Sequence, residues 1–253
     1  MARFAPIAPL PVLERLRNAG VLGDYHFLLA HDVLAKQDEY REFYSNPLEH
    51  PFIIMDNGVV ELGEAMPVLQ VLEAARVVGA NTMVLPDVPY DAKWTLAAIQ
   101  DALGKLREIS HPPLMAVVQG WSEEEAMEFL FELRHRPEIA YLSIPRLMSE
   151  VCGTRCRLTK FAVEEVRSNP GRRGVHLLGF SNDILDDMAS ASIPGVMGID
   201  SAVPVRMGLA GEEIELGSET PRRTPGYLDN PYDGAKLFKA AMNISRVRGW
   251  LSG

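Results

Sequence analysis

The sequence is poor in cysteine and has no long apolar run. Its only cysteines among 253 residues are Cys152 and Cys156, which lie close together with no second pair. This argues against a disulfide framework and a four-ligand zinc site, and it favours a reducing compartment. Residues 1–20 lack the uninterrupted apolar core of a signal peptide, and no segment approaches the length of a membrane span. We therefore expect a cytoplasmic protein with no membrane partner.

The sequence also has fewer basic than acidic residues. It contains 25 Lys and Arg against 34 Asp and Glu, which gives a formal net charge of −9. This charge argues against a general nucleic-acid binder, because phosphate contacts use Lys and Arg. Basic residues nevertheless cluster in residues 146–160 and towards the C-terminus, where Arg222 and Arg223 are neighbours. Each cluster is consistent with a local basic surface or with an ordinary solvated face.

Several catalytic motifs are missing as well. The six histidines show neither HxxxH nor HxH spacing, which weakens a metallohydrolase interpretation. The chain has no GxSxG elbow of a serine hydrolase, and no GxGxxG or Walker loop for a nucleotide. It is nonetheless 47% hydrophobic, which is ordinary for a globular protein with a sizeable core.

Short apolar runs alternate with amphipathic segments through most of the chain. Strands are predicted at residues 3–7, 25–31, 51–56, 81–87, 113–119, 139–145, 175–180 and 195–200. Helices are predicted at residues 11–20, 65–79, 92–109, 122–135, 160–168, 182–190 and 235–251. Strands that are apolar throughout are buried on both faces, which is typical of a parallel sheet. We therefore predict an α/β fold, a (β/α)8 TIM barrel.

An open doubly wound sheet is the structural alternative, and the missing Gly-rich loop argues against it. The chain length suits a single barrel domain. We expect residues 1–210 to form the catalytic barrel. Residues 211–253 should add a loop rich in Pro, Gly and charge, followed by a closing helix of the same domain.

Polar residues stand at the carboxyl ends of most predicted strands. They are His31-Asp32, Asp56-Asn57-Gly58, Asp87, Gln119-Gly120, Ser143 to Arg146, Gly179 and Asp200. A single strand-end Asp often caps the next helix or starts a turn. In a barrel, however, all carboxyl ends meet at the face where active sites lie. Three carboxylates and one glutamine are therefore predicted to converge on one site.

Two kinds of chemistry suit this set. Paired carboxylates serve glycosyl transfer, in which one attacks the anomeric carbon and the other moves protons at the leaving group. An Asp beside an amide matches the edge of a guanine-like base. The carboxylate accepts from N1–H and the 2-amino group, and the amide donates to the carbonyl oxygen.

Six segments resemble, in order and spacing, the strand-end motifs of the tRNA-guanine transglycosylases. They are PFIIMDNG, VGANTMVLPDVPYDA, MAVVQG, YLSIPRLMSE, VHLLGFSNDILDDM and GIDSAVPVR, and the resemblance runs from about residue 4 to residue 206. Those enzymes are zinc-bearing TIM barrels that exchange guanine for a 7-deazaguanine. The small chain is most similar to the DpdA-like DNA 7-deazaguanine transglycosylases of phages and bacteria.

The resemblance implies roles for individual residues. Asp200 matches the nucleophile that attacks C1′, and Asp56 matches the general acid/base at the departing and incoming bases. Asp87 and the pair Gln119-Gly120 match the groups that read the Watson–Crick edge and the carbonyl of the base.

Further positions match the walls and rim of the family's site. Leu178 and Gly179 match the pocket wall beneath the base. Glu150 falls at an acidic position beside the 7-substituent, and Arg206 matches an arginine that faces phosphate.

The sequence also departs from the family pattern. The Cys-rich zinc site near the C-terminus has no counterpart, since the two cysteines lie in the wrong strand connection. After Asp56 the family carries Ser-Gly-Gly-Phe, whose ring stacks on the base, whereas this chain has Asn57 and Gly-Val-Val. Where the family has Gly-Gly-Leu, this chain has Ile-Pro-Arg, in which Pro145 lacks an N–H and Arg146 can contact phosphate or substrate.

The resemblance therefore implies a pentosyltransferase that replaces guanine in nucleic acid through a covalent Asp200 intermediate. Because the Cys-rich zinc site has no counterpart in the sequence, we expect no metal, and we expect no cofactor. The incoming base is expected to be 7-cyano-7-deazaguanine or a related base. DNA is favoured over tRNA because the zinc subdomain, which forms part of the tRNA-binding surface, is missing. The target base must leave its stack, through flipping or in unpaired strands. A basic rim with Arg146, Arg155 and Arg157 is expected to bind the polymer.

Several alternatives stay open. A tRNA substrate would keep the mechanism, and a partner protein that opens the duplex is compatible with the sequence. An N-glycosidic-bond hydrolase on the same barrel would use water as acceptor. A non-catalytic partner subunit is disfavoured, because Asp56, Asp87 and Asp200 are all present. A phage-encoded protein would act in the host cytoplasm.

Overall fold

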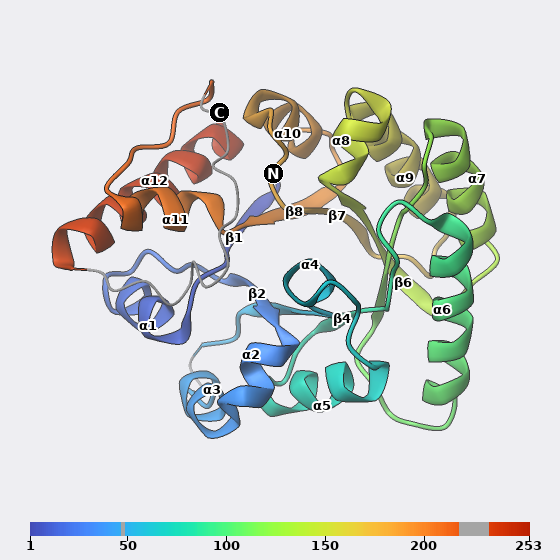
Figure 1. Cartoon of the computed structure of the whole chain (residues 1–253), viewed down its shortest axis with the longest axis horizontal. Helices are drawn as coiled ribbons and strands as arrows, with labels where there is room; N and C mark the ends of the chain where they lie inside the picture. Colours follow the sequence, from blue (N-terminus) through green and yellow to red (C-terminus); the bar gives the residue numbers. More distant parts are fainter. Residues whose placement is uncertain (47–48, 218–232) are drawn as a thin grey trace.

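The protein folds as a barrel of eight parallel strands surrounded by helices. The computed structural model describes residues 1–46, 49–217 and 233–253. The strands pair in the order β1-β8-β7-β6-β5-β4-β3-β2, and every ladder is parallel. The two end strands, β1 and β2, lie against each other, so the barrel is nearly closed (Figure 1). The predicted (β/α)8 barrel is confirmed.

All eight predicted strands are present. They are β1 Arg3–Pro6, β2 Tyr25–Leu29, β3 Phe52–Asp56, β4 Thr82–Val84, β5 Leu114–Val117, β6 Ile139–Pro145, β7 Gly174–Leu178 and β8 Val196–Ser201. Several are shorter than predicted at their carboxyl ends, because the polar residues there already belong to loops or helices. His31 and Asp32, for example, lie in the first turn of helix α2, where an acidic side chain favours the helix start.

The long amphipathic segments form the outer ring of helices. They are α1 Leu10–Asn18, α5 Val68–Val78, α6 Ala92–Leu106, α7 Glu123–Leu133, α9 Cys156–Ser168, α10 Ile184–Ala191 and α12 Gly234–Ser252. Five shorter helices were not predicted: α2 Ala30–Ala35, α3 Gln37–Tyr44, α4 Val59–Leu62, α8 Leu147–Cys152 and α11 Val203–Ala210. Of these, α4 lies over the centre of the barrel mouth, at the carboxyl end of β3 (Figure 1).

The barrel has an interior core separate from the layer between strands and helices. Tyr25, Phe27 and Leu29 alternate along β2 and belong to the interior core, as strand geometry requires. Gly198 on β8 provides the space for the Tyr25 ring, because a Cβ there would lie 2.3 Å from Tyr25 Cε1. Phe27 and Leu29, nearer the carboxyl end, reach the floor of a pocket at the mouth.

The C-terminal helix packs closely on the rest of the barrel. A Cβ on Gly208 of α11 would lie 2.2 Å from Ala240 Cα of α12, so this glycine allows the two helices to touch. Asn243 of α12 donates to the carbonyl oxygens of Pro204 at 3.1 Å and Glu212 at 3.0 Å. Among the helices that the structure describes, none combines the length and apolarity needed to cross a membrane.

Candidate active site

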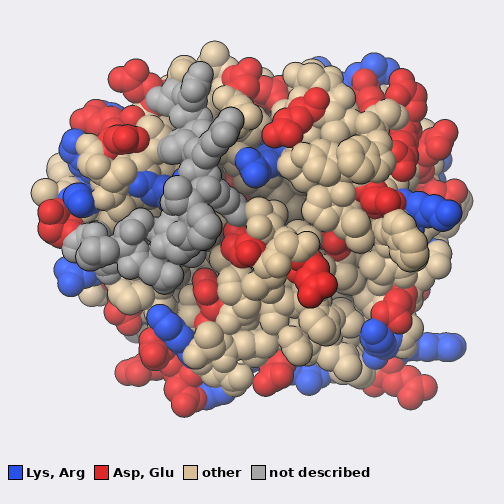
Figure 2. Space-filling model, viewed as in Figure 1, with Lys and Arg blue, Asp and Glu red and all other residues tan. Residues whose placement is uncertain are grey.

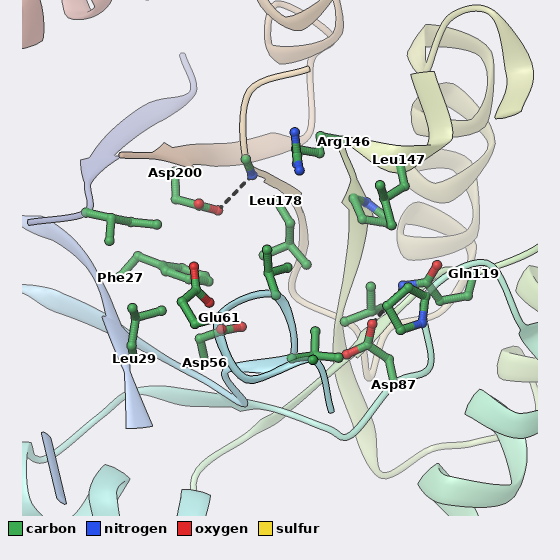
Figure 3. A pocket seen from close by; sticks show the side chains of 18 of the residues that line it. Phe27, Leu29, Asp56, Glu61, Asp87, Gln119, Arg146, Leu147, Leu178 and Asp200 are labelled. Carbon is green, nitrogen blue, oxygen red and sulfur yellow. Dashed lines mark hydrogen bonds between the residues drawn. The ribbon is translucent and has the colours of Figure 1, made fainter. Parts of the chain in front are cut away.

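One pocket opens at the carboxyl ends of the strands, where the sequence predicted the site. Its cavity of about 290 Å³ lies near the lower end of the range for small-molecule pockets. The floor is apolar, and the walls carry the four polar side chains predicted to converge: Asp56, Asp87, Gln119 and Asp200. Glu61, Tyr90 and Arg146 line the cavity as well. Asp200 and Asp56 lie on one side of the cavity and Asp87 and Gln119 on the other, with Leu178 between them (Figure 3). The predicted convergence of these four residues is therefore observed.

Asp200 lies one residue before the end of strand β8, and two hydrogen bonds fix its side chain. His176 Nε2 donates to Asp200 Oδ1 at 2.9 Å, and the backbone N–H of Gly179 donates to the same oxygen at 3.3 Å. The hydroxyl of Tyr25 lies 2.8 Å from His176 Nδ1. Burial raises the pKa of Tyr25 well above its ordinary value, so this phenol keeps its proton and can donate it to Nδ1. A carboxylate only accepts hydrogen bonds, so the proton in the contact with Asp200 is on Nε2. The tautomer with Nε2–H follows from these contacts.

Asp56 lies at the end of β3 and is almost fully buried. Burial raises its pKa well above the ordinary value, and the negative charge of Glu61 on α4 raises it further. The backbone N–H of Gly58 donates to Asp56 Oδ2 at 3.0 Å and opposes this shift. Gly58 has φ of 74°, in the left-handed region that favours glycine, and a Cβ there would meet His31 Nδ1 at 2.9 Å. The site thus favours the protonated form of Asp56.

Asp87 is held by two side-chain amides. Asn57 Nδ2 donates to Asp87 Oδ1 at 2.7 Å, and Gln119 Nε2 donates to Asp87 Oδ2 at 2.7 Å. Burial raises the pKa of Asp87, and the two amide hydrogen bonds oppose that rise. Gln119 Oε1 in turn accepts the backbone N–H of Tyr90 at 2.9 Å. Asp87 is therefore pre-oriented where it lines the cavity.

Asn57 is one of the strand-end residues predicted to bind the substrate, but its side chain does not face the pocket. Its side chain is buried and also donates to the carbonyl oxygen of Leu85 at 2.8 Å. It does not line the cavity. Within the described residues, it therefore supports Asp87 from behind and does not face the pocket.

Leu178, Gly179 and Arg146 line the pocket as predicted. Gly120, Glu150 and Arg206, which were also predicted as site residues, do not line it. Gly120 sits where a Cβ would meet the backbone nitrogen of Ala126 at 2.7 Å, so it allows helix α7 to start close to β5. Glu150 is exposed on α8, and Arg206 is half-buried on α11, both outside the lining.

The prediction that Arg155 belongs to a surface rim is wrong. Its side chain is fully buried, and NH2 donates to Asp187 Oδ1 at 2.6 Å and to the carbonyl oxygen of Gly179 at 3.0 Å. The buried carboxylate of Asp187, on helix α10, pairs with this guanidinium. The spacing of residues 146–160 gives no sign of a partner on another helix. Arg157 is exposed and pairs with Glu123 Oε1 at 3.0 Å. Arg222 and Arg223 lie outside the described residues.

The structure adds residues that the sequence did not single out. His176 forms a hydrogen bond with Asp200, and Tyr25 forms one with His176. The charge of Glu61 raises the pKa of Asp56, and Tyr90 lines the pocket. A histidine within the apolar run of β7 was the available signal for His176. The others had none, since their positions depend on contacts between distant strands and loops.

The cysteines do not form a metal site. Cys156 Sγ accepts the hydroxyl of Ser190 at 3.1 Å, and both Cys152 and Cys156 are free thiols. Over residues 1–46, 49–217 and 233–253, no three His, Cys, Asp or Glu side chains gather as metal ligands. The zinc ligands that the resemblance implies therefore have no counterpart in this part of the chain.

Comparison with family models and with curated proteins finds no match for this chain. The chemistry of the pocket is therefore what supports a functional proposal.

Proposed function

We propose that this protein is a base-exchanging transglycosylase that replaces guanine in nucleic acid, with DNA favoured, by a 7-deazaguanine such as 7-cyano-7-deazaguanine. The observation that carries the proposal is the arrangement of one small pocket. A positioned Asp200 and a buried Asp56 of raised pKa share it with an Asp87–Gln119 pair on the opposite side (Figure 3). Glycosyl transfer from a guanine nucleoside requires these three roles: a nucleophile, a proton donor and a group that recognises the base.

In the first step, a carboxylate oxygen of Asp200 attacks C1′ of the sugar. The new bond is between that oxygen and C1′, and the bond that breaks joins C1′ to the base nitrogen. The electron pair of the broken bond stays on the base, which takes the proton of Asp56. Since both hydrogen bonds from His176 and Gly179 fall on Asp200 Oδ1, Oδ2 is the oxygen that we assign as nucleophile.

The second step reverses the first with another base. The carboxylate of Asp56 takes the N–H proton of the incoming 7-deazaguanine, whose nitrogen attacks C1′ and releases Asp200. Two displacements at C1′ retain its configuration. Asp87 is suited to accept hydrogen bonds from the N1–H and 2-amino groups of both bases, and Gln119 to donate to the carbonyl oxygen if its amide turns from Asp87. Retention and a shared base site distinguish exchange from single-step hydrolysis.

DNA is proposed over tRNA because the chain lacks a counterpart of the Cys-rich zinc subdomain, which contributes to tRNA binding in the enzymes that it resembles. A base inside a duplex stack cannot reach this pocket at the barrel mouth, so the target base must be flipped or unpaired.

To test this, the purified protein is incubated with single-stranded DNA, duplex DNA or tRNA, in each case together with 7-cyano-7-deazaguanine. The nucleic acid is then digested and its nucleosides are measured by mass spectrometry. We expect the 7-deazaguanosine product in DNA, and its loss in Asp200→Asn. The matched control is Asp32→Asn, which removes a strand-end carboxylate that lies outside the pocket lining.

Each outcome bears on the proposal. Product in tRNA alone would overturn the choice of polymer and keep the mechanism. Free guanine released without an incoming base would show a hydrolase. Absence of both product and released guanine from all three substrates would overturn the proposal, as would equal activity in Asp200→Asn and wild-type protein.

A further inference from the structure

Two aromatic rings stand together at the edge of the pocket, on different loops. Tyr90, in the loop between β4 and α6, lines the cavity. Trp121, in the loop between β5 and α7, stacks on it with ring centroids 5.1 Å apart and an interplanar angle of 17°. Trp121 is 68% exposed. The stack therefore extends from the cavity wall into solvent.

The backbones of both residues are held in place. Tyr90 has φ of 67°, which is uncommon for a residue other than glycine, and its N–H donates to Gln119 Oε1 at 2.9 Å. Its hydroxyl donates to Glu150 Oε2 at 3.2 Å. Such strain persists where surrounding contacts impose it, often at functional sites. The same Gln119 side chain contacts Asp87, so the orientation of Tyr90 is tied to the base-reading pair.

Trp121 is anchored at the start of helix α7. The backbone N–H of Trp121 donates to Glu125 Oε2 at 2.8 Å, and the backbone N–H of Glu125 donates to Ser122 Oγ at 3.2 Å. This resembles a capping box and satisfies the helix start without the indole. With Tyr90 against one face, the exposed indole presents the remaining apolar surface to solvent.

We propose that Trp121, backed by Tyr90, stacks on the unpaired nucleobase next to the one in the pocket. The inference rests on the proposed function, which brings a nucleic-acid strand to this mouth. Aromatic faces bind bases of any sequence, because every base has a π-face. Stacking also needs no positive charge, which suits a protein of net charge −9. Stacking on the exposed Trp121 thus adds affinity for the strand, because a rim with few basic residues would bind it only weakly.

The test measures binding of a dye-labelled oligothymidylate by fluorescence anisotropy. This probe contains no guanine, so its binding does not depend on exchange. We expect Trp121→Ala to weaken binding about 5- to 150-fold, the range for loss of one base stack. Trp121→Phe should retain most of the affinity. The matched control is Trp94→Ala, which removes another exposed tryptophan (65%) that does not line the pocket.

The exchange assay separates this inference from the proposed function. In an active enzyme, Trp121→Ala should raise KM for the oligonucleotide and leave KM for the free 7-deazaguanine unchanged. Exchange with unchanged oligonucleotide affinity in Trp121→Ala overturns the stacking site and keeps the transglycosylase. Trp121-dependent binding without exchange keeps the stacking site and overturns the transglycosylase. Failure of the wild-type protein to bind, or an equal loss in Trp94→Ala, overturns the stacking site.

Discussion

At the residue scale, Asp56 links stability to catalysis in one carboxyl group. Burial, and then the charge of Glu61, raises its pKa well above the ordinary value of 3.8. Ionising Asp56 is therefore harder in the folded protein than in the unfolded chain. The protonated form contributes its full stability below pH 3.8, and this contribution is lost as pH rises towards and through the raised pKa.

We predict that Asp56→Asn stabilises the fold and abolishes most exchange. The amide can keep the hydrogen bond from Gly58 but never ionises, so the gain in the free energy of unfolding should be near zero below pH 3.8 and increase above it. Exchange should fall by about 10²- to 10⁴-fold, since the leaving base loses its proton donor. Urea titrations across pH measure the first effect and product analysis the second. A stability difference independent of pH would contradict a raised pKa.

His176 is predicted to position Asp200 without touching substrate. His176→Leu removes the 2.9 Å hydrogen bond to Asp200 and should lower kcat about 10- to 150-fold, corresponding to the ~1.5–3 kcal/mol of a hydrogen bond to a charged group. KM for the incoming base should stay unchanged, because Asp87 and Gln119 are untouched. His176→Gln, which keeps a donor, should restore part of kcat. Equal kcat in the leucine variant and the wild type would remove His176 from this role.

At the element scale, a buried ion pair joins the connections after β6 and β7. Arg155 contacts the carbonyl oxygen of Gly179 as well as Asp187, and Asp187 Oδ2 accepts the N–H of Ser181 at 2.8 Å. Gly179 in turn contacts Asp200. The Arg155–Asp187 pair therefore supports the pocket wall that holds the nucleophile.

Arg155→Ala should destabilise the protein by about 3–5 kcal/mol, because it leaves the Asp187 carboxylate buried without its partner. Arg157→Ala, which removes an exposed arginine from the same helix start, should change stability by less than about 0.5 kcal/mol. Chemical denaturation measures both. The double variant Arg155→Met/Asp187→Leu should recover part of the loss, since it removes both charges. Equal stability of Arg155→Ala and Arg157→Ala would show that the buried pair contributes little.

The elements themselves were largely predictable from local patterns. Continuous apolar runs identified all eight strands, and amphipathic spacing identified seven helices. The other five helices have four to eight residues and were missed, because such lengths give weak periodicity, although it was sufficient for the eight-residue α10. Helices α2, α4, α8 and α11 begin within three residues of a strand end, where the polar residues indicate a turn and hide the helix start.

The site was predictable to the extent that it follows from strand ends. Asp56, Asp87, Gln119 and Asp200 were identified because a barrel brings such residues together. The burial of Arg155 could not be predicted, because it depends on its ion pair with Asp187, 32 residues away. The same holds for the left-handed backbone of Tyr90, which is held by a glutamine on another loop.

At the scale of the whole molecule, charge limits how a polymer can bind. The net charge is −9, and on the face in Figure 2 Lys and Arg are scattered among Asp and Glu. With Arg155 buried, Arg146 at the pocket and the exposed Arg157 remain as the predicted phosphate contacts among the described residues of 146–160. Binding of nucleic acid should therefore depend only weakly on salt.

Two phosphate contacts give a slope of about −1.4 for the logarithm of single-strand affinity against the logarithm of salt concentration, since each contributes about −0.7. Affinity for an oligonucleotide should then fall about sevenfold between 50 and 200 mM salt. Arg157→Glu should weaken binding and flatten the slope by about 0.7 while the fold stays intact, since its side chain is 68% exposed. Arg155→Glu should instead unfold the protein, because it would place a second carboxylate beside Asp187. Circular dichroism separates the two causes of weaker binding, and an unchanged slope in folded Arg157→Glu would exclude this residue from the phosphate contacts.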